Sequence, residues 1–316
     1  MILKFLKIIE IIFFPFTFLI GIYMHYLTKP SPEKIPVSYN WLSKCGWLPI
    51  KFHYYQSIIR KEMLPENFEK IENPLIGINL NVENQLKLLE EFSYNAELEK
   101  ISERKKNDFD PYFNNQFFSQ GSDEIYYNMI RYFKPKIIVE IGAGESTKFA
   151  NLAIKQNNNK FFKNEHFCIE PYENQWLQKL NIDFIRKPVE KIGIDFFEKL
   201  SENDILFIDS SHVIRSQGDV VHEYLNIIPS LKKGVIIHCH DIFLPKEYPI
   251  NWIVKEKRFW NEQYLLQALL THSSRYKILL ACNYLSLFHD NKLQKCCPNY
   301  QKNNIKGNSS FWFQVV

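Results

Sequence analysis

Short apolar runs recur along the second half of the chain, and polar stretches of helical length separate them. The runs occupy residues 136–142, 165–170, 182–185, 204–209, 234–240, 276–281 and 310–315. Their length and their β-branched residues predict buried strands. Because strands that alternate with helices indicate an α/β fold, we expect a doubly wound, Rossmann-like sheet of seven mostly parallel strands with a terminal antiparallel strand.

A longer apolar run occupies residues 11–27, after Lys4, Lys7 and Glu10. Its length of about 17 residues is at the short end of a bilayer span. We therefore expect residues 1–28 to form a membrane-anchor helix. A signal peptide is less favoured because no small-residue cleavage site follows the run. A buried N-terminal helix is the third interpretation.

The segment between this helix and the strands has two parts. Four prolines between residues 28 and 49 predict an extended linker. Apolar positions in residues 84–101 are spaced as in an amphipathic helix. We expect a linker and helical accessory region over residues 29–115 and the α/β domain over residues 116–316.

Composition and charge narrow the class of protein. Hydrophobic residues make up 46% of the chain, which is typical of a globular protein and not of a disordered one. The formal net charge is only +4 and the basic residues are scattered, so no nucleic-acid partner is expected. None of the six cysteines forms a CxxC pair, which argues against a zinc knuckle and fits a reducing compartment.

Candidate chemistry begins at the loop after the first strand. Glu140 ends this strand, and Gly142 permits a tight bend because it has no Cβ. Gly144 allows a ligand to approach the main chain. Ser146 or Thr147 then caps the following helix.

Dinucleotide-binding enzymes share a GxG turn, so this turn alone leaves the ligand open. Thr147 stands where a third glycine would complete the dinucleotide motif. Glu170 ends the next strand, and a carboxylate there can accept both hydroxyls of a ribose. The loop therefore predicts a nucleoside-containing cofactor.

The series Glu140-x-Gly142-x-Gly144-x-Ser146 resembles motif I of the class I S-adenosylmethionine-dependent methyltransferases. Residues 208–212, Ile-Asp-Ser-Ser-His, are similar to the Ile-Asp-Gly-Asp-His element of the methyltransferase-24 group and its metal-dependent O-methyltransferase relatives. Residues 229–234 and the pair His240-Asp241 are similar to further elements of that group, and the resemblance covers about residues 117–245. The metal-dependent relatives have Asp-Asp where this chain has His240-Asp241.

The resemblance implies a set of site residues. S-adenosylmethionine would contact Glu140, Gly142, Gly144, Ser146, Glu170 and Asp209. Asp209, His212, His240 and Asp241 would carry the chemistry. Two versions stay open: Asp209 and Asp241 hold Mg²⁺ or Mn²⁺ that activates an acceptor hydroxyl, or His212 or His240 is a general base.

Further positions extend the site. Trp260, Asn261 and Tyr264 are candidates for an acceptor pocket, while packing of a long loop explains them equally well. Residues Phe118, Ser119 and Asp123 are expected to close over the cofactor, and His238 is taken as structural. Asp209 could instead cap a following helix.

Together these features predict a methyltransferase that is membrane-associated and acts on a hydroxyl of a small molecule or glycan. Its catalytic domain is expected in the cytoplasm because the methyl donor is made there. An NAD-dependent oxidoreductase is the alternative enzyme. A non-catalytic, membrane-tethered interaction module of the same fold is the third hypothesis.

Overall fold

The structure is a computed structural model of the 316-residue chain. It describes residues 2–29, 34–118, 121–158, 163–172, 176–300 and 308–316. The chain divides into two compact units, Met1–Ile59 and Arg60–Val316. Each unit is described by itself.

The first unit contains α1 (Ile2–Leu27) and α2 (Pro36–Lys44). Within the stretch Lys4–Leu27 of α1, the most apolar 18-residue window has a mean hydropathy of 2.1 and no buried residues. This is long and apolar enough for a membrane span. A signal sequence near the N-terminus meets the same criterion.

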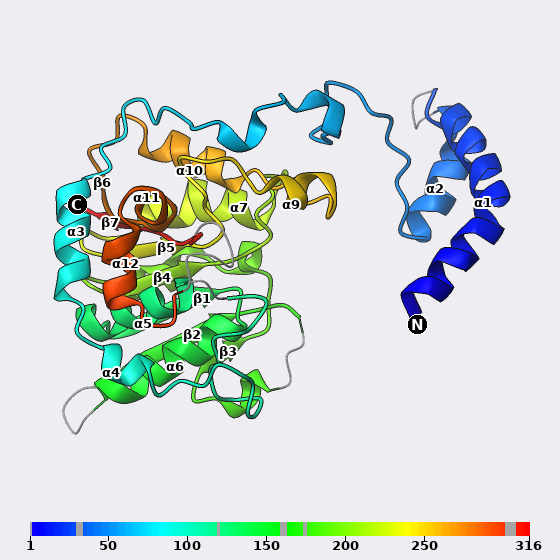
Figure 1. Cartoon of the computed structure of the whole chain (residues 1–316). Helices are drawn as coiled ribbons and strands as arrows, with labels where there is room; N and C mark the ends of the chain where they lie inside the picture. The colour runs from blue at the N-terminus through cyan, green and yellow to red at the C-terminus, as the bar shows by residue number, and fades with distance from the viewer. Residues whose placement is uncertain (1, 30–33, 119–120, 159–162, 173–175, 301–307) are drawn as a thin grey trace. The chain divides into compact units, whose positions relative to one another are not determined.

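The second unit is built on one seven-stranded sheet of order β3-β2-β1-β4-β5-β7-β6 (Figure 1). The strands are β1 (Ile137–Ile141), β2 (Glu165–Ile169), β3 (Asp183–Ile185), β4 (Ile205–Ile208), β5 (Ile236–Cys239), β6 (Tyr276–Ala281) and β7 (Phe311–Val315). β1 to β5 pair in parallel, whereas β7 runs antiparallel to both β5 and β6. The predicted fold, including its antiparallel terminal strand, is confirmed.

Alternate residues of each strand bury themselves in different layers, as the two-residue period of a strand requires. Ile138, Ile205 and Ile236 lie in the layer formed with α5 (Ser122–Phe133) and α6 (Glu145–Asn157). Val139, Leu206 and Ile237 lie in the opposite layer, formed with α7 (Asp219–His222), the π-helical segment Glu223–Ile227 and α10 (Glu262–Leu270). The strands are therefore covered on both faces, which explains their continuous apolar runs.

The remaining helical elements are mostly short. The α-helices are α3 (Val82–Glu91), α4 (Asn95–Leu98), α8 (Ile228–Ser230), α9 (Ile250–Val254), α11 (Cys282–Phe288) and α12 (Asp290–Cys296). The 3-10 turns are Lys61–Met63, Phe68–Lys70, Leu177–Lys179, Val189–Lys191 and Ile194–Lys199.

The helix expected over residues 84–101 is divided into α3 and α4. Asn81, just before α3, donates a hydrogen bond from Nδ2 to the carbonyl of Ile278 in β6. Oε1 of Gln85 accepts the amide N–H of Ala281 at 2.8 Å. These bonds tie α3 to the sheet, so the helical part of the expected accessory region packs on the α/β body, which extends back to Arg60.

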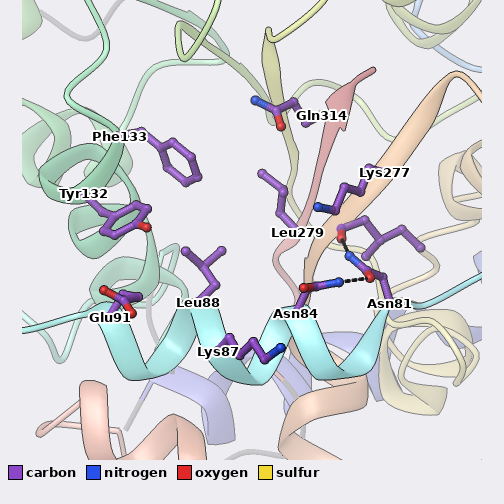
Figure 2. Close-up of a pocket in the computed structure, with 11 residues that line it drawn as sticks. Asn81, Asn84, Lys87, Leu88, Glu91, Tyr132, Phe133, Lys277, Leu279 and Gln314 are labelled. Atoms are coloured by element: carbon purple, nitrogen blue, oxygen red, sulfur yellow. Dashed lines mark hydrogen bonds between the residues drawn. The ribbon is translucent and has the colours of Figure 1, made fainter.

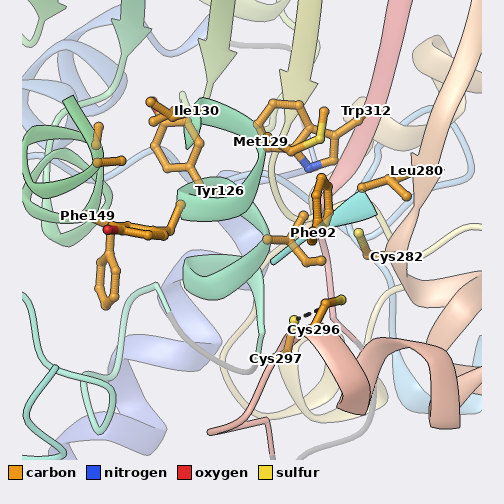
Figure 3. Packing of buried hydrophobic residues seen from close by; sticks show 14 of the residues in the cluster. Phe92, Tyr126, Met129, Ile130, Phe149, Leu280, Cys282, Cys296, Cys297 and Trp312 are labelled. Atoms are coloured by element: carbon orange, nitrogen blue, oxygen red, sulfur yellow. Dashed lines mark hydrogen bonds between the residues drawn. The ribbon is translucent and has the colours of Figure 1, made fainter. Parts of the chain in front are cut away.

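Large aromatic side chains fill the layer beneath the site. Tyr126 of α5 stacks on Phe207 of β4 with ring centroids 4.9 Å apart, and both are fully buried. Figure 3 shows the same layer around Tyr126, Phe149 and Trp312.

A surface hollow lined by α3, the end of α5 and the start of β6 contains Lys277 and Gln314 (Figure 2). Gln314 pairs with Ile236 at the start of β5, so the hollow lies near the amino ends of the parallel strands.

Candidate active site

The bend after β1 lies between the ends of two neighbouring strands. Gly142 has a φ of +84°, and a Cβ on it would meet the carbonyl oxygen of Asp209 at 1.9 Å. Its N–H donates to the carbonyl of Ile169 at 3.0 Å, while the N–H of Asp209 donates to Ile141 at 2.9 Å. Only glycine fits this position, because both the backbone conformation and the contact with β4 exclude a side chain.

Gly144 has a different role from Gly142. Among the described residues, no atom beyond Gly144 and its two chain neighbours lies within 4 Å of where its Cβ would be. Its N–H donates to Oγ1 of Thr147 at 3.1 Å, so Thr147 supports the start of α6 and Ser146 is buried in the first turn. The open space beside Gly144 lies at a helix N-terminus, where main-chain N–H groups favour polar ligands.

Glu170 lies beside this bend. One carboxylate oxygen accepts the N–H of Ala143 at 3.3 Å, and the other accepts the N–H of Tyr172 at 2.8 Å. These two bonds hold the carboxylate between the β1 loop and the end of β2. The predicted ribose-binding acid and the predicted cofactor loop are therefore adjacent.

The side chain of Glu140 points the other way, into the core. It is fully buried, accepts the hydroxyl of Tyr126 at 3.0 Å and lies 3.1 Å from Nε2 of His166. Cys168 contacts the same carboxylate at 3.4 Å, and burial followed by this charge raises the pKa of the thiol. The side chain of Glu140 thus holds the end of β1 against the core, and its main chain directly precedes the bend.

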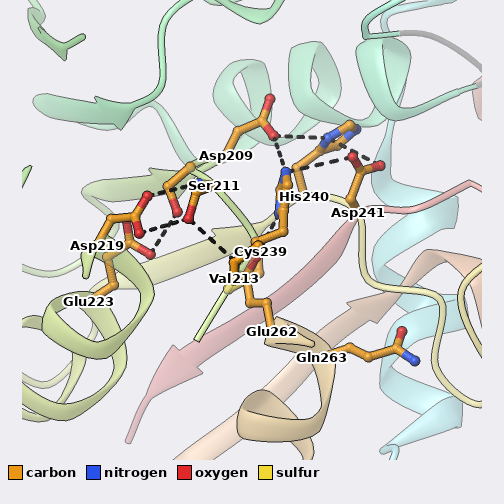
Figure 4. Close-up of polar contacts among 12 residues, drawn as sticks. Asp209, Ser211, Val213, Asp219, Glu223, Cys239, His240, Asp241, Glu262 and Gln263 are labelled. Atoms are coloured by element: carbon orange, nitrogen blue, oxygen red, sulfur yellow. Dashed lines mark hydrogen bonds and ion pairs between the residues drawn. The ribbon is translucent and has the colours of Figure 1, made fainter. Parts of the chain in front are cut away.

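The four predicted catalytic residues meet at the carboxyl ends of β4 and β5. Figure 4 labels three of them, Asp209, His240 and Asp241. Nε2 of His212 is 3.2 Å from Oδ1 of Asp209 and 3.7 Å from Oδ2 of Asp241. Nδ1 of His240 is 3.4 Å from Oδ1 of Asp209 and 3.5 Å from Oδ1 of Asp241. The carboxylates face the two imidazoles, and the segment after Asp209 is not helical until α7, so Asp209 is not a helix cap.

Glu262 joins this cluster from α10, and sequence reasoning missed it. Its Oε2 is 2.7 Å from Nδ1 of His212, its Oε1 accepts the hydroxyl of Tyr224 at 2.8 Å, and it is fully buried. The main chain supports the same contact, because Asn261 and Glu262 both donate N–H groups to the carbonyl of His212. The sequence did contain one sign of this role, because Glu262 directly follows the predicted pocket residues Trp260 and Asn261.

The charges in the cluster stabilise one another. Burial alone would raise the pKa of Asp209, but His240 and His212 outweigh it and lower that pKa. Burial lowers the pKa of His212, but Asp209, Glu262 and Asp241 raise it well above its ordinary value. The pKa of His240 is also raised, because Asp241 and Asp209 outweigh its burial.

Polar contacts hold the loop after Asp209 in place. Asp219, at the start of α7, accepts both the N–H of Ser211 at 2.9 Å and its hydroxyl at 2.7 Å. Ser210 donates to Glu223 at 3.0 Å. Although Ser210 and Ser211 differ from the Gly-Asp of the resembling group, they anchor this loop to α7.

The other expected positions divide between the site and its surroundings. The ring of Trp260 lies 4.2 Å from that of His212, and the ring of Phe118 lies 4.9 Å from that of His240. Asn261 accepts the N–H of Ile214, and the hydroxyl of Tyr264 donates to Glu247. Of these four residues, Trp260 and Phe118 border the cluster through their rings, Asn261 contacts it through its main-chain N–H, and Tyr264 points toward Glu247.

Two further predicted residues, Asp123 and His238, are buried and held by contacts in the core. Burial raises the pKa of Asp123 to about 7, and its carboxylate accepts the N–H of Gly121 at 3.1 Å. Ser119 lies outside the described residues. His238 stacks on Trp312 at 4.0 Å and hydrogen-bonds Ser310 at 2.9 Å, as a packed core histidine does.

The donor set suits a cation. Ligand atoms of Asp209, His240 and Asp241 all lie within 4.8 Å of one another. Nδ1 of His240 is buried, faces both carboxylates and has no hydrogen-bond partner among the described residues. Two carboxylate oxygens and one imidazole nitrogen are ordinary ligands of divalent metals.

The chain is similar to known proteins over part of its length. The sequence profile of a family described as a methyltransferase domain, the methyltransferase-24 group, matches residues 139–242. An uncharacterized protein of Archaeoglobus fulgidus is 33% identical over 167 residues, which are 48% of this chain and 74% of that protein. The chain belongs to the class I S-adenosylmethionine-dependent methyltransferases.

Solved structures similar to this methyltransferase include O-methyltransferases with bound cofactor. TomG from Streptomyces achromogenes, in complex with SAM, is 11% identical with a TM-score of 0.37, covering 62% of this chain and 79% of its own. The Bacillus cereus O-methyltransferase, in complex with SAH, is 14% identical with a TM-score of 0.37, covering 73% and 90%.

Proposed function

We propose that the protein transfers a methyl group from S-adenosylmethionine to a hydroxyl of a small molecule or glycan at the carboxyl edge of β1, β4 and β5. One observation carries the proposal. The carbonyl of Asp209 packs against Gly142 in the cofactor bend, while the side chain of Asp209 faces His212 and His240. The predicted cofactor loop and the acid–imidazole cluster are therefore two sides of one site, at the strand-order switch where α/β sheets bind ligands.

The chemistry needs a positioned acceptor oxygen. That oxygen attacks the methyl carbon in line with the sulfonium, a C–O bond forms, the C–S bond breaks, and S-adenosylhomocysteine leaves. In this proposal Glu170 holds the ribose and the main chain at Gly142 and Gly144 contacts the methionine part. The protein contributes orientation and removal of the acceptor proton.

The proton can leave by two routes. In the first, Asp209, His240 and Asp241 hold a divalent cation, which lowers the pKa of an acceptor hydroxyl. In the second, His212, oriented by Glu262, accepts the proton at Nε2 after losing its own proton, a step that its raised pKa opposes. We favour the metal route because the cluster contains three carboxylates, those of Asp209, Asp241 and Glu262, and only two imidazoles. A bound cation offsets this excess of negative charge.

We also propose that α1 anchors the protein in a membrane, with the methyltransferase unit on the cytoplasmic side. The apolar stretch Lys4–Leu27 supports this by length and composition. The cytoplasmic side follows from the site of synthesis of the methyl donor.

Calorimetric titration and a donor-labelled transfer assay test the function. We expect the full chain to bind S-adenosylhomocysteine and not NAD, and to label a hydroxyl-bearing compound in membrane or glycan extracts. Binding of NAD alone would instead support the oxidoreductase, and binding of neither would support a non-catalytic module. Loss of transfer with EDTA, restored by Mg²⁺ or Mn²⁺, supports the first proton route, and transfer that EDTA leaves unchanged rejects it.

A further inference from the structure

The stretch after α1 has an unusual combination of side chains. Residues 34–59, named here the basic-aromatic segment, contain no Asp or Glu and include Lys34, Lys44 and Lys51. Arg60 and Lys61 follow directly. Two of the six tryptophans of the chain, Trp41 and Trp47, also lie in it. A segment with only positive formal charge and many aromatic residues is suited to an anionic, partly apolar surface.

The apolar side chains of this segment are exposed. Trp41 and Trp47 are each 67% exposed, and Tyr54 and Tyr55 are 76% and 77% exposed. Throughout residues 34–59, all of which the structure describes, no side chain is buried. Isolated exposed apolar residues are ordinary, but a continuous group indicates a surface that binds something.

Local contacts give the segment a definite shape. The hydroxyl of Tyr39 in α2 donates to the carbonyl of Pro49 at 2.7 Å, and the N–H of Trp47 donates to Leu42 at 2.8 Å. The chain after α2 therefore folds back along the helix. Beyond it, the rings of His53, Tyr54 and Tyr55 group with centroids 4.2 to 4.7 Å apart.

The position along the chain identifies what binds there. α1 ends at Leu27, and the segment begins at Lys34. The few residues between them span at most about 25 Å of extended chain, less than the thickness of a bilayer. Tryptophan and tyrosine are enriched at membrane interfaces, and lysines next to a span attract anionic lipid headgroups.

We propose that the basic-aromatic segment lies in the headgroup region of an anionic bilayer, with its tryptophans in the interface and its lysines on lipid phosphates. The inference rests on the proposed anchoring by α1 and adds a second, electrostatic attachment next to it. Two attachments hold the methyltransferase unit near the membrane surface more firmly than one apolar helix does.

Cys45 makes the test possible in the full chain. It is the one exposed cysteine of the six, and the other five are buried. A fluorescent maleimide on Cys45 reports the surroundings of the segment, and Cys45→Ser shows that labelling is specific. The labelled protein is reconstituted in vesicles of phosphatidylcholine alone or mixed with phosphatidylglycerol. Quenching by iodide in water is compared with quenching by spin-labelled lipid.

In the mixed vesicles we expect protection from iodide and quenching by lipids that carry the spin label near the headgroup. The double variant Lys44→Gln/Lys51→Gln should lower the ratio of lipid-bound to free segment, read from the quenching, about 25-fold at low salt. Each lysine near an anionic surface contributes about fivefold to this ratio. Trp41→Ser/Trp47→Ser should also reduce the lipid quenching. The matched control Lys87→Gln/Lys191→Gln removes two exposed lysines of the other unit and should leave the quenching unchanged.

The outcomes separate this inference from the anchor. Release of the protein from vesicles by an alkaline wash overturns the anchoring by α1. Retention with a label that iodide reaches freely overturns the headgroup location. Protection from iodide without lipid quenching also overturns it, because a protein partner or a second copy then covers the segment. Affinity for S-adenosylhomocysteine should be unchanged in the three double variants and in the labelled protein, because neither the substitutions nor the label lies in the cofactor site.

Discussion

Nδ1 of His212 lies 2.7 Å from a carboxylate oxygen of Glu262, although 50 residues separate them in the chain. The carboxylate is fully buried, and its second oxygen is held by the hydroxyl of Tyr224. Glu262 is therefore fixed on both sides, and the contact determines which imidazole nitrogen of His212 faces Asp209 and Asp241. We interpret Glu262 as a positioning residue for the cluster.

Glu262→Gln should lower kcat about ten- to hundredfold, the usual cost of losing a group that orients a site residue. The KM for S-adenosylmethionine should change little because Glu262 is not at the bend. Steady-state kinetics at varied donor concentration measure the difference. Glu247→Gln is the control, since its carboxylate contacts the half-exposed Tyr264 and not the cluster. An unchanged kcat in Glu262→Gln would show that the contact only packs α10.

The two glycines of the bend should respond differently to the same substitution. Gly142→Ala places a methyl group 1.9 Å from the carbonyl oxygen of Asp209 at a φ of +84°, which should cost at least about 2 kcal/mol of stability. Gly144→Ala meets open space among the described residues. It should keep the melting temperature and weaken S-adenosylhomocysteine binding instead.

Differential scanning fluorimetry and calorimetric titration on both variants measure this contrast. If Gly144→Ala bound the cofactor as tightly as the parent, the cofactor would not occupy the space beside Gly144. A Gly142→Ala protein as stable as the parent would mean that the β1 and β4 ends separate without cost.

Glu170→Gln should reduce the affinity for S-adenosylhomocysteine about ten- to hundredfold. The amide keeps the shape of the side chain but loses the charge that strengthens hydrogen bonds from ribose hydroxyls. Titration calorimetry gives the ratio directly. Glu165→Gln is a matched control because it begins the same strand, β2, at the opposite edge and is exposed. Equal affinities in the two variants would exclude Glu170 as the ribose acceptor.

The sequence predicted the strands and the bend because each is determined locally. Buried parallel strands need continuous apolar runs, and a tight bend against β4 needs Gly142. Chain order also brought Asp209 and Asp241 to one edge, since the carboxyl ends of parallel strands lie together. These features depend on residues that are close in sequence or on the sheet rule alone.

Features that depend on long-range packing could not be predicted from local sequence patterns. Glu262 reaches His212 from a helix 50 residues away, and no periodicity reports that distance. Glu140 shows the same limit: its place in a motif does not reveal that Tyr126 and His166 hold its side chain in the core. The joining of α3 to β6 through Gln85 and Ala281 likewise depends on the folded sheet.

A final prediction concerns the pH dependence of stability where α4 meets α5. Glu97 forms two contacts of 2.8 Å with the guanidinium of Arg131 and accepts the hydroxyl of Tyr127. Partial burial works against ionisation of Glu97, but the bonds from Arg131 and Tyr127 outweigh it and lower its pKa. A carboxylate with a depressed pKa stabilises the fold above its unfolded pKa, and the contribution disappears as pH falls through the folded value.

Glu97→Gln should therefore cost about 2 kcal/mol at neutral pH, the range for hydrogen bonds to a charged group. The difference from the parent protein should shrink as the pH falls below about 4 and vanish once Glu97 is protonated in both states. Urea unfolding across this range measures it, with Glu99→Gln, an exposed neighbour, as the control. A difference that stayed constant with pH would show that shape, and not the charge of Glu97, holds α4 against α5.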